Sequence, residues 1–179
     1  VENDFVLGFV GRISYEKDIH EIIDFVSRLK EEVPNLKYMI VGNGEALDYL
    51  KKYAKKKEVE DRIIFVGEIK NDKVKLFYGL FDAFSTASTF ETQGLTYVEA
   101  MTAGCPLLVR DDECLDNFVE NRINGLKYTC FEEFKEYFTD YFYKYDYIVG
   151  DYAYNKLRLK GFYEDNKKEA KELNKIKNK

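Results

Sequence analysis

Two glutamates eight positions apart, Glu91 and Glu99, stand where a helix is expected to begin after an apolar run. Thr92 is predicted to cap that helix, and Gly94 would let a ligand approach its first free amides. Unpaired N–H groups and the helix dipole both favour an anion at such a position. The segment therefore predicts a seat for a phosphate group, with one carboxylate just ahead of the helix and one inside it.

Glu99 is placed on the helix by its spacing. It falls about 40° from Leu95 on a wheel of 100° per residue, so its side of the helix also carries Thr102 and Ala103. A carboxylate on such an apolar side needs hydrogen-bond partners, which ribose hydroxyls could supply. The alternatives are a salt bridge to a neighbouring cation for Glu99 and a solvated loop position for Glu91.

A second candidate segment, Gly11 to Lys17, places the cations Arg12 and Lys17 within six residues at the opening of another helix. Gly11 permits a close turn of the backbone, and the two cations could clamp a diphosphate. Ordinary surface charge at a turn between a strand and a helix would give the same pattern.

The scaffold for these segments is read from alternating apolar runs and helical patterns, the sequence form of repeated β-α units. Consecutive apolar residues, as in Ile63 to Val66, are expected for strands covered on both faces. We predict a Rossmann-like, doubly wound, six-stranded parallel sheet with helices on both faces. The six runs are Phe5 to Val10, Leu36 to Val41, Arg62 to Val66, Asp82 to Thr86, Pro106 to Val109 and Gly125 to Tyr128. In the commonest order, 3-2-1-4-5-6, the ligand crevice lies between the first and fourth strands, so the segments after Val10 and Thr86 meet.

Helical spacing of apolar residues predicts a first helix from Ile19 to Val33. Weaker patterns of the same kind cover Glu45 to Lys57, Asp72 to Phe81 and Gly94 to Ala103. After Phe131 the chain becomes aromatic and helical, which indicates packing on the sheet or a partner surface. We therefore expect a donor-binding domain over residues 1–145 and a helical extension over 146–179, with a solvated, lysine-rich end.

Composition narrows the function classes. The net charge of -5 gives no global attraction to nucleic acid, which is an unlikely partner. Three cysteines without C-x-x-C spacing and a single histidine give no metal-binding pattern, and indicate reduced thiols in a cytoplasmic protein. No apolar run approaches the roughly 20 residues of a membrane span. The chain begins without Met, so it is expected to be part of a longer protein.

The ordered set of motifs resembles one family. Glu91 and Glu99 form an E-x(7)-E signature, and with them stand Gly11-Arg12, Glu16-Lys17, Val41-Gly42-Asn43-Gly44, Val66-Gly67 and Ala100 to Pro106. Together these resemble the carboxyl-terminal domain of family 4 retaining glycosyltransferases, which have the GT-B fold. Thr92 to Thr96 and Arg110 to Leu115 are most similar to bacterial diacylglycerol glucosyltransferases.

The resemblance implies a role for each matching residue. It assigns Arg12 and Lys17 to the diphosphate, Glu91 to hydroxyls of the transferred sugar and Glu99 to the ribose. The amides of Gly94 and Leu95 would hold the distal phosphate, and the backbone at Gly42, Val66 and Gly67 would frame the base. Thr92-Gln93 stands where many members have an aromatic residue or proline, so the sugar is not fixed.

The implied function is retaining transfer of a hexose from a nucleotide sugar, with UDP-glucose or UDP-galactose expected as donor and no cofactor or metal required. The resemblance places the lipid or glycan acceptor on an amino-terminal domain absent from this chain, so the chain alone should be inactive. A lipid acceptor would bring the whole protein to the inner face of the membrane as a peripheral protein. The alternatives are a non-catalytic nucleotide-binding module, a paired-carboxylate glycosidase and a Rossmann oxidoreductase. The last is disfavoured because no G-x-G-x-x-G follows the first strand.

Overall fold

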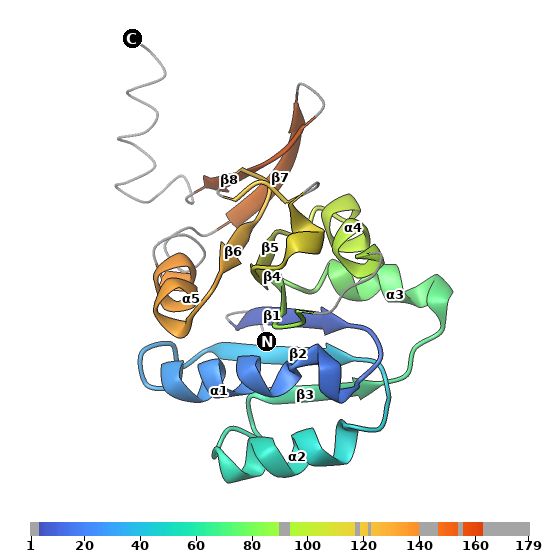
Figure 1. Ribbon diagram of the computed structural model, residues 1–179, viewed down its shortest axis with the longest axis vertical. Coiled ribbons are helices and arrows are strands. Elements are labelled where there is room, and N and C mark those ends of the chain that lie inside the picture. The colour runs from blue at the N-terminus through green and yellow to red at the C-terminus, as the bar shows by residue number, and fades with distance from the viewer. Residues whose placement is uncertain are drawn as a thin grey trace.

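A computed structural model describes residues 4–89, 94–116, 119–121, 123–139, 147–153 and 156–162. Its centre is a six-stranded, all-parallel sheet in the order β3-β2-β1-β4-β5-β6 (Figure 1). The predicted fold class and strand order are both confirmed. The strands are β1 Phe5–Val10, β2 Leu36–Val41, β3 Ile63–Gly67, β4 Ala83–Thr86, β5 Leu107–Arg110 and β6 Leu126–Tyr128.

Helices cover both faces of the sheet. On one face pack α1 (Ile19–Leu29), α2 (Leu47–Lys56) and α5 (Phe131–Tyr137), and on the other α3 (Asn71–Tyr78) and α4 (Leu95–Thr102). Two short 3-10 turns, η1 (Tyr15–Lys17) and η2 (Glu113–Leu115), follow β1 and β5. Among the described residues, no helix is both long and apolar enough to cross a bilayer.

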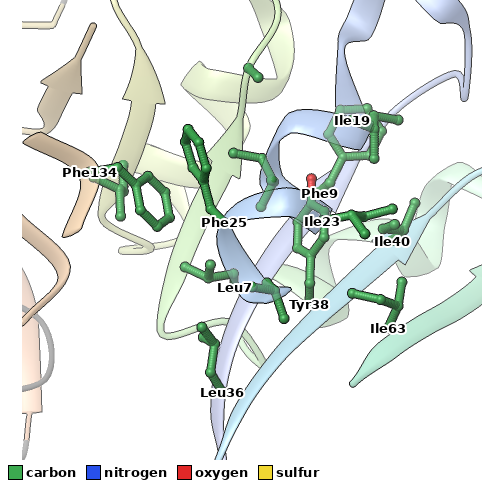
Figure 2. Packing of buried hydrophobic residues seen from close by; sticks show 14 of the residues in the cluster. Leu7, Phe9, Ile19, Ile23, Phe25, Leu36, Tyr38, Ile40, Ile63 and Phe134 are labelled. Carbon is green, nitrogen blue, oxygen red and sulfur yellow. The ribbon is translucent and has the colours of Figure 1, made fainter. Parts of the chain in front are cut away.

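The helix α1 shows how the sequence pattern produces the packing. Its isoleucines, Val26 and Leu29 recur at helical spacing, and all of them are buried. Figure 2 shows Ile19 and Ile23 of this helix packed over Leu7, Tyr38 and Ile40 of the sheet, with Phe25 near Phe134 of α5. The helix ends at Leu29, earlier than the predicted Val33, because a turn leads into Pro34.

The junction between α4 and β5 holds a buried cysteine, Cys105. Burial raises the pKa of its thiol to about 12, whereas Cys114 is partly exposed and Cys130 exposed. The thiol of Cys105 therefore behaves as a small apolar group in the hydrophobic cluster between the sheet and the helices α3 and α4.

The helical extension predicted over 146–179 is wrong for residues 147–153 and 156–162. Strands β7 (Tyr147–Ala153) and β8 (Lys156–Phe162) pair there as an antiparallel hairpin. The signal was present in the sequence, because charged and apolar residues alternate strictly from Lys156 to Lys160, which is the period of a strand. The lysine-rich end, 163–179, lies outside the described residues.

Candidate functional site

Three neighbouring strands end in glycine at the carboxyl edge of the sheet. Gly11 follows β1, Gly42 follows β2 and Gly67 closes β3, and each has a positive φ. The amide of Gly11 donates to the carbonyl of Val41 at 3.0 Å, and that of Gly42 donates to the carbonyl of Gly67 at 2.8 Å. The segments after the three strands are thus joined by backbone hydrogen bonds.

Gly42 is required at its position by both conformation and space. Its φ is 141°, and a Cβ there would lie 1.9 Å from the carbonyl oxygen of Gly11. Any side chain would therefore push the segments after β1 and β2 apart. Glycine keeps this wall made of bare backbone.

These segments enclose a cavity, here called the glycine-walled cavity, of about 390 Å³. This volume lies within the range of small-molecule sites. Its wall consists of Val10, Gly11, Arg12, Val41, Gly42, Asn43, Glu68, Ile69, Asn71 and Val74.

Arg12 stands at the rim of this cavity and is largely exposed. Its guanidinium pairs with Glu16 one turn later, with Nη2 to Oε1 at 2.8 Å. A backbone N–H in the same turn and, to a smaller extent, Arg12 hold the pKa of Glu16 below its usual value. Lys17 ends η1 and is half-buried, outside the cavity wall. An incoming phosphate would therefore compete with Glu16 for Arg12.

The helix α4 starts at Leu95, one residue after Gly94, whose φ of 58° lies in the left-handed region. Its first amides face the carboxyl edge, because β4 precedes this helix and lies beside β1. The N-cap of α4 is thus Gly94, so the prediction that Thr92 caps this helix is wrong. Glu91 and Thr92 lie outside the described residues.

The expected environment of Glu99 is corrected by the structure. The buried residues of α4 are Tyr97 and Ala100, whereas Leu95, Glu99 and Thr102 are exposed. The helix has only eight residues and carries apolar side chains on both sides, so hydropathy alone selected the wrong face. Glu99 accepts a hydrogen bond from the Tyr78 hydroxyl on α3, at 2.8 Å.

Glu99 and Tyr78 lie in a second hollow, the α3–α4 groove, of about 600 Å³. Its wall consists of Asn71, Val74, Lys75, Leu76, Tyr78, Gly79, Val98, Glu99, Thr102 and Ala103. Asn71 and Val74 also line the glycine-walled cavity, so the two hollows are neighbours along α3.

A charged network occupies the other half of the same edge. Arg110, at the end of β5, pairs with Glu21 in the first turn of α1, and the Tyr128 hydroxyl donates to Glu21 at 3.3 Å. Burial raises the pKa of Glu21, and Arg110 offsets part of that rise. The network joins β5, β6 and α1 beneath the crevice.

The structure therefore brings together only part of the predicted site. Gly11, Arg12 and Gly42 share one cavity, whose wall does not include Val66 or Gly67. Glu99 lies in the adjoining groove. The prediction missed Glu68 and Ile69, although they directly follow a strand at the same edge. It also missed Asn71, Val74 and Tyr78 on α3, for which the sequence contains no local signal. Among the described residues, no group of three or more His, Cys, Asp or Glu side chains is placed to hold a metal ion.

Comparison with known families decides what kind of domain carries this site. The sequence model of the family described as "Glycosyl transferases group 1" matches residues 1–143. The chain belongs to this family. A second family model, described as "Putative antitoxin YutD-like", matches residues 112–178 and overlaps the end of the first.

Curated relatives of this group 1 glycosyltransferase domain include two enzymes of the same name. The alpha-monoglucosyldiacylglycerol synthase of Acholeplasma laidlawii is 40% identical over 134 residues, covering 74% of this chain and 34% of the relative. That of Streptococcus pneumoniae is 38% identical over 120 residues, covering 66% of this chain and 27% of the relative. The chain thus spans about a third or less of the length of these relatives.

Solved structures of GT-B glycosyltransferases resemble the glycosyltransferase domain in fold. TarM superposes with a TM-score of 0.72 at 20% identity, over 79% of this chain and 28% of that chain. Anabaena Alr3699/HepE in complex with UDP gives a TM-score of 0.67 at 25% identity, over 77% of this chain and 40% of that chain. The predicted family and GT-B architecture are confirmed.

Proposed function

We propose that this chain binds the nucleotide-sugar donor of a retaining hexosyltransferase, with UDP-glucose or a closely similar UDP-hexose as donor. The observation that supports the proposal is that the glycine-walled cavity and the α3–α4 groove adjoin along α3, where Asn71 and Val74 line both. A base, a ribose and a diphosphate need such an elongated site, with cationic and carboxylate groups at separate points. The structures of HepE with UDP and with UDP-glucose support the choice of donor.

We assign the roles of the individual groups as the family resemblance implies them. The base would lie against the backbone at Gly42, Val66 and Gly67. The diphosphate would face Arg12 and Lys17, with its distal phosphate on the amides of Gly94 and Leu95. The amides of Gly11 and Gly42 already donate to Val41 and Gly67, so the side-chain cations and α4 must supply the positive charge.

The carboxylates would bind the hydroxyl groups of the donor, the ribose at Glu99 and the transferred sugar at Glu91. Transfer breaks the bond between the anomeric carbon and a phosphate oxygen, and the electron pair stays on the diphosphate. Positive charge at Arg12 and Lys17 would stabilise that leaving group without a metal or cofactor, once the phosphate has displaced Glu16 from Arg12.

We further propose that the acceptor, a lipid or glycan, binds to a second domain outside this chain. The names of the two synthases support a diacylglycerol lipid as the acceptor. With such an acceptor, the whole protein would act as a peripheral protein at the inner face of the membrane. Closure of two domains excludes water and completes such sites. The 179-residue chain alone is therefore expected to bind donor and to transfer nothing.

The test is calorimetry of the chain with UDP, UDP-glucose, GDP-mannose and NADH, followed by assays with a diacylglycerol acceptor. We expect the uridine compounds to bind and Arg12→Ala to weaken them about tenfold, as loss of a charged hydrogen bond does. Arg28→Ala is the matched control, because Arg28 is also exposed and paired with a glutamate, Glu132. Equal loss in both variants, or turnover by the chain alone, would contradict the proposal.

A further inference from the structure

Tyr78 is the link between the two helices that border the α3–α4 groove. It is the last residue of α3, and only 2% of its surface is exposed. Its ring is held by Phe81 and Phe84, with ring centroids at 5.9 and 6.1 Å. The direction of its hydroxyl is therefore fixed by the core and not by the groove.

That hydroxyl meets the carboxylate of Glu99, which lines the groove. It donates to Oε2 of Glu99 at 2.8 Å, and the carbonyl of Thr96 is a more distant acceptor at 3.4 Å. Burial and the hydrogen bond to Glu99 raise the pKa of the Tyr78 hydroxyl well above its usual value. Tyr78 thus remains a proton donor at any physiological pH.

The bond matters because Glu99 is an exposed residue on a helix surface. An exposed glutamate side chain samples several rotamers, and fixing it on a ligand costs conformational entropy. Because Tyr78 holds Oε2, the Glu99 side chain is already ordered before a ligand binds, and less conformational entropy is lost on binding. The other lone pairs of the carboxylate stay available to the ligand.

We propose that Tyr78 is a positioning residue that holds Glu99 toward the vicinal hydroxyls of the donor's ribose and so makes the site selective for ribonucleotides. The inference rests on the proposed function, since it gives Glu99 a nucleotide to bind. Two hydroxyls on adjacent carbons can donate to one oriented carboxylate. A 2′-deoxyribose offers one donor fewer, and it gains less from the orientation.

The experiment compares UDP with 2′-deoxy-UDP on the 179-residue chain, with dissociation constants from calorimetry. Tyr78→Phe removes only the hydroxyl and keeps the ring that packs on Phe81 and Phe84. We expect it to weaken UDP about five- to tenfold and 2′-deoxy-UDP less than about twofold, so the discrimination falls. In a Glu99→Gln background, Tyr78→Phe should add little further, because the two residues act as one unit.

Tyr53→Phe is the matched control. The Tyr53 hydroxyl also donates to a carboxylate, that of Asp24 on α1, at 2.7 Å. The Tyr53→Phe variant should leave the dissociation constants of UDP and 2′-deoxy-UDP unchanged. Melting curves establish that each variant is folded.

Equal weakening of UDP and 2′-deoxy-UDP by Tyr78→Phe would show that the residue only ties α3 to α4, and it would overturn the inference. Unchanged dissociation constants of both nucleotides in Tyr78→Phe would overturn it as well. Absence of UDP binding by the unaltered chain is a different result, since it would refute the proposed function itself.

Discussion

The carboxyl edge of the sheet is built in two different ways. Along β1, β2 and β3 the wall is backbone, closed by amide-to-carbonyl bonds at Gly11 and Gly42. Elsewhere the contacts are between side chains, Arg110 with Glu21 at the same edge and Tyr78 with Glu99 between α3 and α4. A backbone wall leaves room for a flat base and tolerates no added atom. A wall of side chains positions charged groups, and single substitutions can change each of them separately.

The largest effect is expected from Gly42→Ala, in the backbone half. The new Cβ would lie 1.9 Å from the carbonyl oxygen of Gly11, at a φ of 141° that side chains rarely adopt. We expect a loss of about 3 kcal/mol or more in the free energy of unfolding, measured by urea denaturation.

Gly104→Ala is the control that separates the strain of a side chain at positive φ from the steric clash of the added Cβ. Gly104 also has a positive φ, 76°, but nothing lies within 4 Å of the added carbon. It should cost only the conformational part, about 1 kcal/mol. Equal losses in the two variants would mean that the contact between Gly11 and Gly42 is not a tight one.

The second effect tests the side-chain half through binding. Glu99→Gln keeps the size of the side chain and removes its charge, so UDP affinity should fall by about 1–3 kcal/mol. Stability should change little, because Glu99 is exposed. Glu136→Gln, on α5 and away from both hollows, is the control. An unchanged UDP affinity in Glu99→Gln would remove Glu99 from the site.

A smaller effect is expected from Arg110→Met, and it depends on pH. Burial raises the pKa of Glu21 and Arg110 lowers it, so loss of Arg110 raises that pKa further. The stability that Arg110 contributes requires an ionised Glu21. It is therefore present at pH 7 and lost as pH falls through the pKa of Glu21. We expect a deficit of about 1–2 kcal/mol at pH 7 that disappears near pH 4.

Lys135→Met provides the comparison for a pair on the surface. Lys135 and Glu32 are both well exposed, and such pairs contribute little. The variant should lose less than about 0.5 kcal/mol at every pH. A pH-independent deficit in Arg110→Met would indicate lost packing instead of a lost charge interaction.

The two halves also differ in what the sequence could predict. Gly42 was found through the resemblance to a family, whereas Gly11 adjoins its strand, so the strand pattern and the position of the crevice sufficed to find it. All six central strands were predicted for the same reason, since each is a local run of apolar residues. The side-chain half joins residues that are distant in sequence, such as Arg110 with Glu21 and Tyr78 with Glu99. No local pattern encodes such pairs, because they exist only after the helices pack on the sheet.

The errors have the same origin. The exposed face of α4 was mistaken for a buried one because Leu95 is apolar, yet 61% of its surface is exposed. In β7 and β8 the expectation of a helix outweighed an alternation that was present in the sequence. Whether Glu91 contacts the sugar stays a prediction, since it lies outside the described residues.

The buried thiol of Cys105 gives this domain a chemical reporter of its own motion. Alkylating reagents attack the thiolate, so Cys105 can react only when the junction of α4 and β5 opens to water. The exposed Cys130 reacts without any opening and supplies an internal reference in the same molecule. The ratio of the two alkylation rates, followed by mass spectrometry, therefore measures how often the helix that carries Glu99 detaches from the sheet.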